Sequence, residues 1–370
     1  MPRTPEEQDA LRKRCHTIVA GAADADPGAE LIRVGEWCRD QGWQPDRYGD
    51  GALIGAFETK IAALLGKDAG VFMPSGTMAQ QVALRIWCEK AGLPQFAMHA
   101  TSHLELHEFR GYSRLHRMDA VILGPRERPT LAADLAGCAE RVAALVVELP
   151  AREIGGQLPR WKELCELSDV ARDKGVKLHM DGARLWEARE AYAPRTFAEI
   201  CALFDSVYVS FYKGIGGLAG ALLAGDAALV AEARVWRRRH GGTLPQLHPF
   251  VASAAMRFDA QLAKMPAWRA RAATLAERLA RLPGVRVLPS PPQVNMFHLH
   301  VAAPPAALAD ARDRIAQEDG VWVAPRFAPA QVTGTSFTEI YVGDGLLAAA
   351  DDVVVPWFAK LVAAAQGSVA

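Results

Sequence analysis

An acid and a lysine stand at the ends of two successive apolar segments of this chain. Asp181 ends the segment VKLHMD, and Lys213 follows the segment SVYVSF inside a glycine-rich turn. If both segments are strands of one parallel sheet, their carboxyl ends lie at the edge where such sheets bind ligands. An acid there can pair with a pyridinium nitrogen and a lysine can form a Schiff base, which are two contacts that pyridoxal 5'-phosphate (PLP) requires. The pair therefore predicts a PLP site.

The segments around this pair alternate between apolar strands and amphipathic helices over residues 69–225. FAMHA, DAVILG, AALVVEL and GALLAG read as further strands, and helices such as PRWKELCELSDVARDKG separate them. This alternation predicts βαβ crossovers and an α/β fold with a mainly parallel sheet. Beyond residue 250, long helices are followed by short strands. We therefore expect an N-terminal segment (1–45) packing near the small domain, a large domain (46–250) and a small C-terminal α+β domain (251–370).

Two further stretches contain residue types that bind ligands but are ambiguous by themselves. The turn PSGT at residues 74–77 opens a helix, where backbone N–H groups and the positive end of the helix dipole attract anions. The same residues also form an ordinary Ser/Thr helix cap, and alone they favour that interpretation. His103 lies in a polar segment, TSHLELHEFRGYSRLHR, and a single histidine is more often a surface or hydrogen-bonded residue than a reactive one.

The composition excludes several classes of protein. Lysine plus arginine equals aspartate plus glutamate, 42 each, so no excess charge points to nucleic acid or to an anionic membrane. The six cysteines form no C-x-x-C pair and no Cys/His cluster at zinc spacing, so we expect no metal site. No apolar run reaches the roughly 20 residues of a membrane span, and residues 1–20 lack a signal-peptide core. We expect a cytoplasmic protein whose partners are small molecules and copies of itself.

Five short motifs follow one another along the chain. They are Tyr48-Gly49-Asp50 before FETKIAALLGKDA, the turn PSGTMA from Pro74, the segment His103 to Glu108, the DGAR of Asp181 to Arg184, and the S-x-x-K-G of Ser210 to Gly214. In this order and spacing they resemble the threonine aldolase and β-eliminating lyase family of fold-type I PLP-dependent enzymes, over about residues 46–225. The resemblance implies an aminotransferase-like fold, PLP as cofactor, and a homodimer or homotetramer with shared active sites.

The resemblance implies a role for each cofactor-binding position. Lys213 forms the imine with PLP, Asp181 keeps the pyridine nitrogen protonated, and His103 stacks on the ring and is the candidate base. The turn Ser75, Gly76 and Thr77 binds the phosphate. Arg184 lies near the cofactor's 3-hydroxyl or the substrate carboxylate, although a salt bridge without a cofactor contact is almost as good an interpretation.

The chain departs from the family where the substrate binds. Ala151 stands where the family has a histidine near the substrate hydroxyl, which leaves room for a bulkier or aromatic β-substituent. Glu339 stands where an arginine grips the substrate carboxylate, and Arg326 is the nearest replacement. Tyr48 and Glu108 are further substrate-binding candidates, and Tyr48 and the run Arg237–Arg239 are candidates to reach a neighbouring subunit's site.

These residues predict a PLP-dependent carbon–carbon lyase. It would cleave the Cα–Cβ bond of a β-hydroxy-α-amino acid, such as threonine or phenylserine, to glycine and an aldehyde. The alternatives on the same scaffold are β-elimination and amino-acid racemisation. A binding module or regulator is a further alternative, but the chain has no appended DNA-binding domain and keeps Lys213, Asp181 and His103.

Overall fold

Two compact units make up the chain in the computed structural model, which describes residues 3–20 and 26–367. The larger unit comprises residues 26–153 and 157–264, and the smaller comprises 3–20, 154–156 and 265–367. Helix α12 (His248–Leu262) packs with α2 (Pro27–Asp40) and α3 (Ala52–Leu64), and it therefore belongs to the larger unit. The limits expected from the sequence, 45 and 250, stay a prediction.

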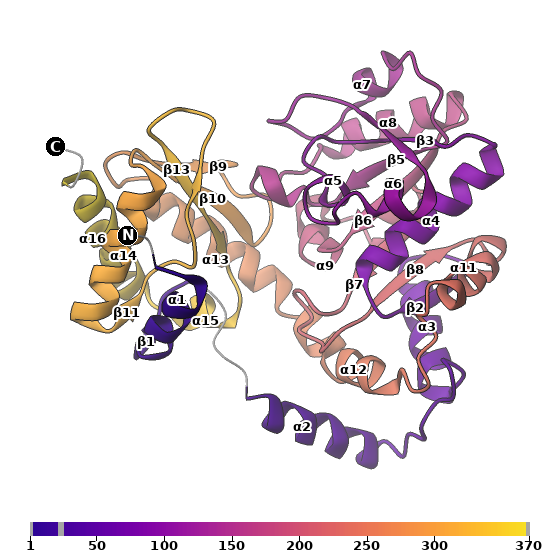
Figure 1. The fold of residues 1–370 in the computed structure, drawn as a ribbon, viewed down its shortest axis with the longest axis horizontal. Helices are drawn as coiled ribbons and strands as arrows, with labels where there is room; N and C mark the ends of the chain where they lie inside the picture. The colour runs from indigo at the N-terminus through magenta and orange to yellow at the C-terminus, as the bar shows by residue number, and fades with distance from the viewer. Residues whose placement is uncertain (1–2, 21–25, 368–370) are drawn as a thin grey trace. The chain divides into compact units, whose positions relative to one another are not determined.

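A seven-stranded sheet forms the centre of the larger unit (Figure 1). Its order is β2 (Ala69–Met73), β8 (Ala221–Gly225), β7 (Ser206–Ser210), β6 (Lys177–Gly182), β5 (Ala144–Glu148), β3 (Gln95–Met98) and β4 (Asp119–Ile122). The strands are parallel except β8, which is antiparallel to β2 and β7. Only residues 211–220 connect β7 to β8, and a parallel connection needs a crossover of about a dozen residues or more. The predicted α/β fold with a mainly parallel sheet is confirmed.

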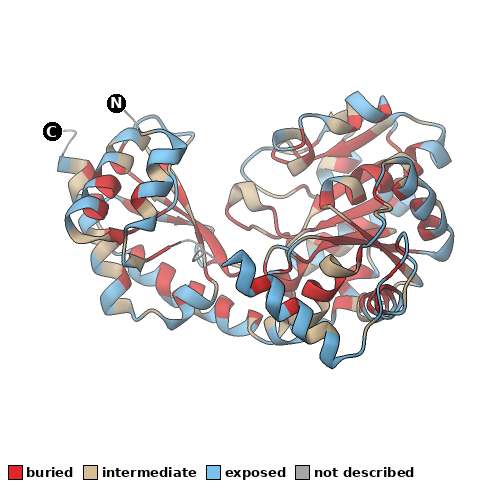
Figure 2. Cartoon of the chain, turned by 60° about the horizontal axis from the view of Figure 1, so that its bottom comes forward, coloured by how far each residue is buried: buried red, intermediate tan, exposed pale blue. Residues whose placement is uncertain are grey.

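Both faces of this sheet are covered, which explains why its strands read as continuous apolar runs. Helices α4 (Gly76–Ala91) and α11 (Ala227–Arg239) pack on one face, against side chains such as Val71 and Leu223. On the other face, the Phe72 and Phe211 rings stack 6.0 Å apart, and Phe57 lies 4.9 Å from Phe211. In Figure 2 the strands of this sheet are largely coloured as buried, and the exposed residues lie mainly on the helices and loops around them. Each such side chain contributes roughly 1.5–3 kcal/mol by burial.

The remaining elements of the larger unit connect the strands. They are α5 (His103–Leu106), α6 (Gly111–His116), α7 (Ala132–Ala136), α8 (Trp161–Asp173), α9 (Leu185–Ala188), α10 (Phe197–Cys201) and 3-10 turns at Arg152–Ile154 and Arg189–Tyr192. Helix α4 begins at a serine cap, because Ser75 Oγ accepts the Met78 N–H at 3.2 Å, and it ends at Gly92 in the left-handed conformation (φ 63°).

The smaller unit is built on a four-stranded antiparallel sheet. Its order is β12 (Ala328–Pro329), β13 (Ser336–Tyr341), β10 (Met296–Val301) and β9 (Val285–Leu288). The helices of this unit are α1 (Pro5–Lys13), α13 (Met265–Leu279), α14 (Pro305–Asp319), α15 (Asp344–Ala348) and α16 (Asp351–Gly367). A short parallel pair, β1 (Thr17–Ile18) with β11 (Val321–Trp322), joins the N-terminal residues to it. Within residues 3–20 and 26–367, no helix is long and apolar enough to cross a membrane.

Candidate active site

The carboxyl ends of three neighbouring strands bring the candidate residues to one edge of the central sheet. Glu148 on β5 is the register partner of Asp181 on β6, and Asp181 is in turn the partner of Tyr208 on β7. Partners in a parallel pair project to the same face. That face is the one covered by α4, because Tyr208 belongs to the core that α4 completes. The site is therefore built between the strand ends and the beginning of α4.

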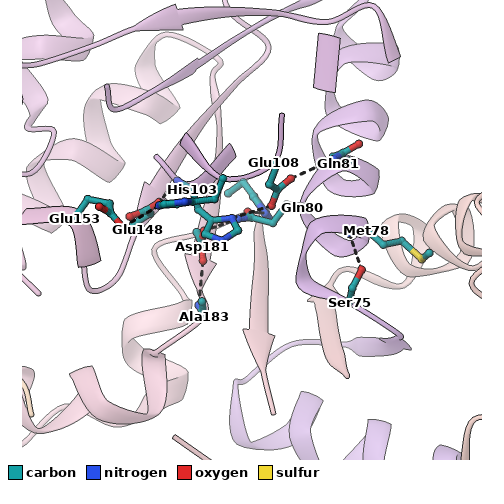
Figure 3. Close-up of polar contacts among 12 residues, drawn as sticks. Ser75, Met78, Gln80, Gln81, His103, Glu108, Glu148, Glu153, Asp181 and Ala183 are labelled. Atoms are coloured by element: carbon teal, nitrogen blue, oxygen red, sulfur yellow. Dashed lines mark hydrogen bonds and ion pairs between the residues drawn. The ribbon is translucent and has the colours of Figure 1, made fainter. Parts of the chain in front are cut away.

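Asp181 is buried and its two carboxylate oxygens are both hydrogen bonded. Oδ1 accepts the Ala183 N–H at 3.0 Å, and Oδ2 accepts a hydrogen bond from Gln80 Nε2 on α4 (Figure 3). Donors on both oxygens restrict the rotation of the carboxylate. The predicted partner of a pyridinium nitrogen is thus held in one orientation.

Behind Gln80, a chain of buried hydrogen bonds runs through the core. Gln80 Oε1 lies 3.0 Å from His179 Nε2, His179 Nδ1 lies 2.8 Å from Ser206 Oγ, and the Trp87 indole donates to Ser206 Oγ at 2.8 Å. Since Gln80 donates to Asp181, its oxygen must accept, so His179 carries its hydrogen on Nε2. Ser206, an acceptor from Trp87, donates its own hydrogen to His179 Nδ1. Burial lowers the pKa of His179 to about 4, so the imidazole is neutral.

Lys213 lies in the turn that follows β7, and its side chain is half-buried. The turn is held by the Gly216 N–H, which donates to the Lys213 carbonyl at 2.9 Å. Burial, and next the positive charge of Arg184, lower the pKa of the Lys213 amine, while the charges of Asp181 and Glu148 act against this. A larger fraction of neutral amine makes a lysine a better nucleophile.

Glu148 shares the strand-end edge with Asp181, and it was not singled out by the sequence. Its Oε1 accepts the His103 N–H at 2.6 Å. Burial, and next the neighbouring Asp181 carboxylate, raise the pKa of Glu148 to about 8. Two adjacent carboxyl groups do not readily ionise together, so Glu148 keeps its proton at neutral pH beside the Asp181 anion.

The His103 ring is oriented by a carboxylate beneath it. His103 Nδ1 lies 3.1 Å from Glu108 Oε1, and the buried Glu108 also accepts from Gln81 Nε2 at 3.1 Å (Figure 3). An ionised carboxylate only accepts, so Nδ1 carries the hydrogen of His103. The structure thus brings His103 to Glu148 and Asp181, and it gives Glu108, predicted to touch substrate, a contact that orients His103.

The predicted phosphate turn is both a helix cap and an anion-binding geometry. Ser75 caps α4, while the backbone N–H groups of Gly76 and Thr77 occupy the first turn, where a helix has no acceptor of its own for them. A Cβ atom on Gly76 would lie 2.0 Å from Tyr208 Oη, so only glycine fits there. At the end of β7, Ser210 Oγ is buried without a hydrogen-bond partner of normal geometry in the described residues. These are the features that a bound phosphate would use.

Four other residues predicted from the sequence or its resemblance are Arg184 and Tyr48 in the larger unit and Arg326 and Glu339 in the smaller unit. Arg184 caps α9, and its Nε is buried with no acceptor within residues 3–20 and 26–367. Tyr48 is 53% exposed, and its N–H donates to the Pro245 carbonyl at 3.0 Å. Arg326 is an exposed residue of the smaller unit, where Glu339 on β13 pairs in register with His298. The relation of Arg326 and Glu339 to Lys213 stays a prediction.

Of the run Arg237–Arg239, expected to reach toward a neighbouring subunit, Arg237 does not do so, whereas Arg238 and Arg239 are exposed and their role stays a prediction. Arg237 is buried, and its Nη1 donates to the Phe72 carbonyl of its own chain at 2.8 Å. The residue lies on the face of α11 that packs on the sheet, where burial lowers the pKa of its guanidinium and the charge of Glu58 acts against this. Arg237 therefore supports the end of β2 just before the phosphate turn.

Sequence reasoning missed several residues that the tertiary structure brings to the site. They are Gln80, Glu148, Glu153 and His179, together with His107 and Ser210, which lie in motifs of the sequence but received no role there. Some signals were present: Glu148 and Ser210 end predicted strands at the carboxyl edge, and His179 points to the same face as Asp181 by strand alternation. No local sequence pattern indicates the contact of Gln80 with Asp181 or that of His107 with Glu153, because each contact joins elements that are distant in sequence.

A mainly parallel sheet with an acid and a lysine at its carboxyl edge defines the class of protein. It is the fold-type I architecture of PLP-dependent enzymes, as the family expected from the sequence implied. Within this class, the model of the β-eliminating lyase family matches residues 43–303, and the chain belongs to this family. The sequence-based assignment to a lyase of this family is confirmed.

Proteins of known sequence and structure agree with this assignment. The low specificity L-threonine aldolase of Escherichia coli K12 is 29% identical over 268 residues, which cover 71% of this chain and 78% of that protein. A Listeria monocytogenes EGD-E protein, a suggested L-allo-threonine aldolase, superimposes with a TM-score of 0.90 at 39% identity and covers 96% of this chain and 99% of its own. An Exiguobacterium sp. 255-15 protein, a suggested aromatic amino acid β-eliminating lyase or threonine aldolase, has a TM-score of 0.89, 38% identity and the same coverage.

Proposed function

We propose that this protein is a PLP-dependent aldolase that cleaves the Cα–Cβ bond of β-hydroxy-α-amino acids to glycine and an aldehyde. The observation that carries the proposal is the pairing of an oriented, buried Asp181 carboxylate with the Lys213 amine, whose pKa is lowered, on neighbouring strand ends. The names of the E. coli and Listeria relatives, which refer to threonine and allo-threonine, support a β-hydroxy amino acid as substrate.

The residues present fit PLP. Lys213 would hold its aldehyde carbon, Asp181 its ring nitrogen and His103 its ring face. The first turn of α4 and the buried Ser210 hydroxyl would bind the phosphate. The unpartnered Arg184 Nε has a hydrogen to offer to the cofactor's 3-hydroxyl or to the substrate carboxylate. When bound, PLP would supply an electron sink for the pair left on Cα as the Cα–Cβ bond breaks.

The chain's own residues would set the charge pattern of the site. Asp181 holds a negative charge that Gln80 and the Ala183 N–H orient. Glu148, protonated at neutral pH, adds no second negative charge beside it. Lys213 would return a proton to Cα, and burial together with the charge of Arg184 lowers the pKa of its amine, so it gives up a proton more readily than an ordinary lysine.

Substrate recognition follows from the positions where the chain differs from the family's pattern. Ala151 is small and buried in the loop that follows β5, which favours a bulky β-substituent such as the phenyl group of phenylserine. Arg326 would bind the substrate carboxylate, and replacing it with Gln should raise KM more than it lowers kcat. A variant with a lower kcat and an unchanged KM would show that another residue binds the substrate carboxylate.

We also propose a homodimer or homotetramer with shared active sites. The supporting observation is the half-exposed Tyr48 side chain, on a segment whose backbone is fixed by the Pro245 carbonyl and by Asp46, which accepts the Gly49 N–H at 2.8 Å. A large aromatic residue that is held rigidly and left exposed is typical of an interface. Light scattering of the purified protein measures the assembly, and a monomer at working concentration would contradict it.

A panel of amino acids tests the proposed reaction. Threonine, allo-threonine and phenylserine should each perturb the visible spectrum of the PLP-loaded protein, and at least one should release an aldehyde with an equal amount of glycine. β-Elimination is the second candidate, because the name of the Exiguobacterium relative includes it. Pyruvate and ammonia from serine, without glycine, would favour elimination, and loss of optical activity without cleavage would favour racemisation. A spectrum that no amino acid changes would contradict all three.

A further inference from the structure

We propose that His107, oriented by Glu153, is the acid–base catalyst at the β-hydroxyl group of the substrate. This inference deepens the proposed aldolase function and rests on it. It assigns to His107 the proton transfer for which His103 was the candidate in the sequence.

Both members of this pair lie at the edge that carries Asp181. His107 follows His103 by one helical turn, its N–H donates to the His103 carbonyl at 2.9 Å, and the two ring centroids are 5.1 Å apart. Glu153 belongs to the loop that leaves the carboxyl end of β5, where the Leu149 N–H donates to the Asp181 carbonyl at 2.9 Å. His107 Nε2 lies 2.9 Å from Glu153 Oε1. The second imidazole of the site therefore has its own carboxylate.

The neighbours of Glu153 connect the pair to the reactive lysine. Arg152 Nη1 donates to Glu153 Oε1 at 2.8 Å. The positive charge of Arg152 also contributes to the lowered pKa of Lys213, after burial and the charge of Arg184, so Arg152 is within electrostatic reach of the amine. Glu153 in turn acts on Glu148, and Figure 3 shows both carboxylates beside His103. The pair His107 and Glu153 therefore lies in the same part of the molecule as the predicted cofactor-binding residues.

The hydrogen bond to Glu153 determines which nitrogen of His107 can act. The carboxylate accepts, so Nε2 carries the hydrogen and Nδ1 holds the basic lone pair. Among the described residues Nδ1 makes no hydrogen bond, and the side chain is 37% exposed, so a proton taken up there can pass to water. General acid–base catalysis commonly uses a histidine with one ring nitrogen bonded to a carboxylate and the other ring nitrogen able to accept a proton.

His103 is less suited than His107 to take the proton of the β-hydroxyl group. Its Nδ1 is bound to the buried Glu108, and a ring that stacks on a planar cofactor presents its face to that cofactor. The two imidazoles therefore have different roles: His103 positions the cofactor, and His107 transfers the proton of the β-hydroxyl group.

The atoms and electrons of the proposed cleavage step are conserved. His107 Nδ1 takes the proton of the β-hydroxyl, the C–O bond becomes C=O, and the Cα–Cβ bond breaks with its electron pair remaining on Cα. Cα then receives a proton from the Lys213 ammonium, and His107 passes its proton to water. Glycine and an aldehyde leave, with no oxidant or reductant required.

Two reactions of one holoenzyme separate this role from a structural one. The variant His107→Asn should release aldehyde from phenylserine and threonine about 10²- to 10⁴-fold more slowly, which is the usual contribution of a general base. It should exchange the α-proton of glycine with D₂O within about two-fold of the wild-type rate, because that exchange involves no β-hydroxyl. Its visible cofactor band should be unchanged. The matched control His16→Asn, on an exposed histidine of the smaller unit, should leave both reactions unchanged.

A second variant and a measurement without cofactor complete the test. Glu153→Gln keeps an acceptor for Nε2 but removes the charge, so the imidazole of His107 in a ¹⁵N NMR titration should lose protons at lower pH than in the wild type. Aldehyde release that stays within two-fold of wild type in His107→Asn, while His103→Asn abolishes it, would overturn the proposal and return the role to His103. Parallel loss of glycine exchange and aldehyde release in His107→Asn would also overturn it. Failure of the proposed function itself looks different, since the wild-type protein would then release no aldehyde from any substrate.

Discussion

Gln80 and Asp181, which are 101 positions apart in the sequence, are joined by a direct hydrogen bond from the Gln80 amide to the Asp181 carboxylate. The amide oxygen of the same Gln80 accepts from His179, so one side chain connects the candidate cofactor anion to a buried chain that ends at Trp87. Since every link has a defined donor, the chain admits one proton arrangement. It holds the Asp181 carboxylate in one rotamer.

Replacement of Gln80 by Met should therefore weaken PLP binding. The isosteric side chain removes a donor to a charged acceptor, an interaction whose loss corresponds to about a ten-fold or larger change in affinity. Equilibrium titration of the apoprotein with PLP measures the effect. Ser168→Ala is the matched control, because it removes another buried hydrogen bond, to the Leu203 carbonyl at 2.9 Å, away from Asp181. Equal affinities in Gln80→Met and wild type would show that the amide does not support the cofactor site.

Lys213→Ala should abolish the visible absorbance band that PLP acquires when it is bound to a lysine. The reason is chemical, because alanine has no amine to condense with the aldehyde. Near-ultraviolet circular dichroism of the variant checks that the fold is intact. A variant that keeps the wild-type band would place the imine on another lysine.

Gly76→Ala should damage the phosphate turn. The added Cβ meets the buried Tyr208 ring, whose hydroxyl lies 2.0 Å from its position, so the beginning of α4 must shift. We expect a loss of about 1–3 kcal/mol in the free energy of unfolding and weaker PLP binding. Gly55→Ala on α3 is the control, since a Cβ there has no neighbour within 4 Å, and it should stabilise the protein by roughly 0.5–1 kcal/mol. Urea unfolding of the apoproteins distinguishes the two, and equal stabilities would contradict the clash.

Glu148→Gln should stabilise the apoprotein increasingly as the pH rises. The folded pKa of Glu148, about 8, lies above its unfolded value, so the folded state binds the extra proton between about pH 4.5 and 8. In that window the wild-type protein loses stability with rising pH, by up to about 1.4 kcal/mol per pH unit. Glutamine keeps an acceptor for the His103 N–H but has no proton to lose. Urea unfolding at pH 5 and pH 8 should show a larger difference between variant and wild type at pH 8. A constant difference would mean that the pKa of Glu148 is not raised.

The fold class and the main cofactor candidates could be predicted because their signals are local. Each strand that ends at the site is a short apolar run, and Asp181 and Lys213 follow their runs directly. The direction of β8 could be missed, because alternation alone does not say that a ten-residue turn is too short for a crossover. Arg237 looked like part of a surface charge run, yet its place on the packed face of α11 turns it toward the Phe72 carbonyl.

By itself, the sequence determined the family and the α/β architecture, and it proposed the acid, the lysine and the phosphate turn, since these depend on residue type and position along single segments. Only the tertiary structure decided which side chains hold them. Register places Glu148 beside Asp181 and makes it keep its proton, and packing of α4 brings Gln80 to the same carboxylate. The loop after β5 brings Glu153 to His107. These contacts join distant segments in a low-dielectric interior, where burial and neighbouring charge, rather than local pattern, set the state of each group.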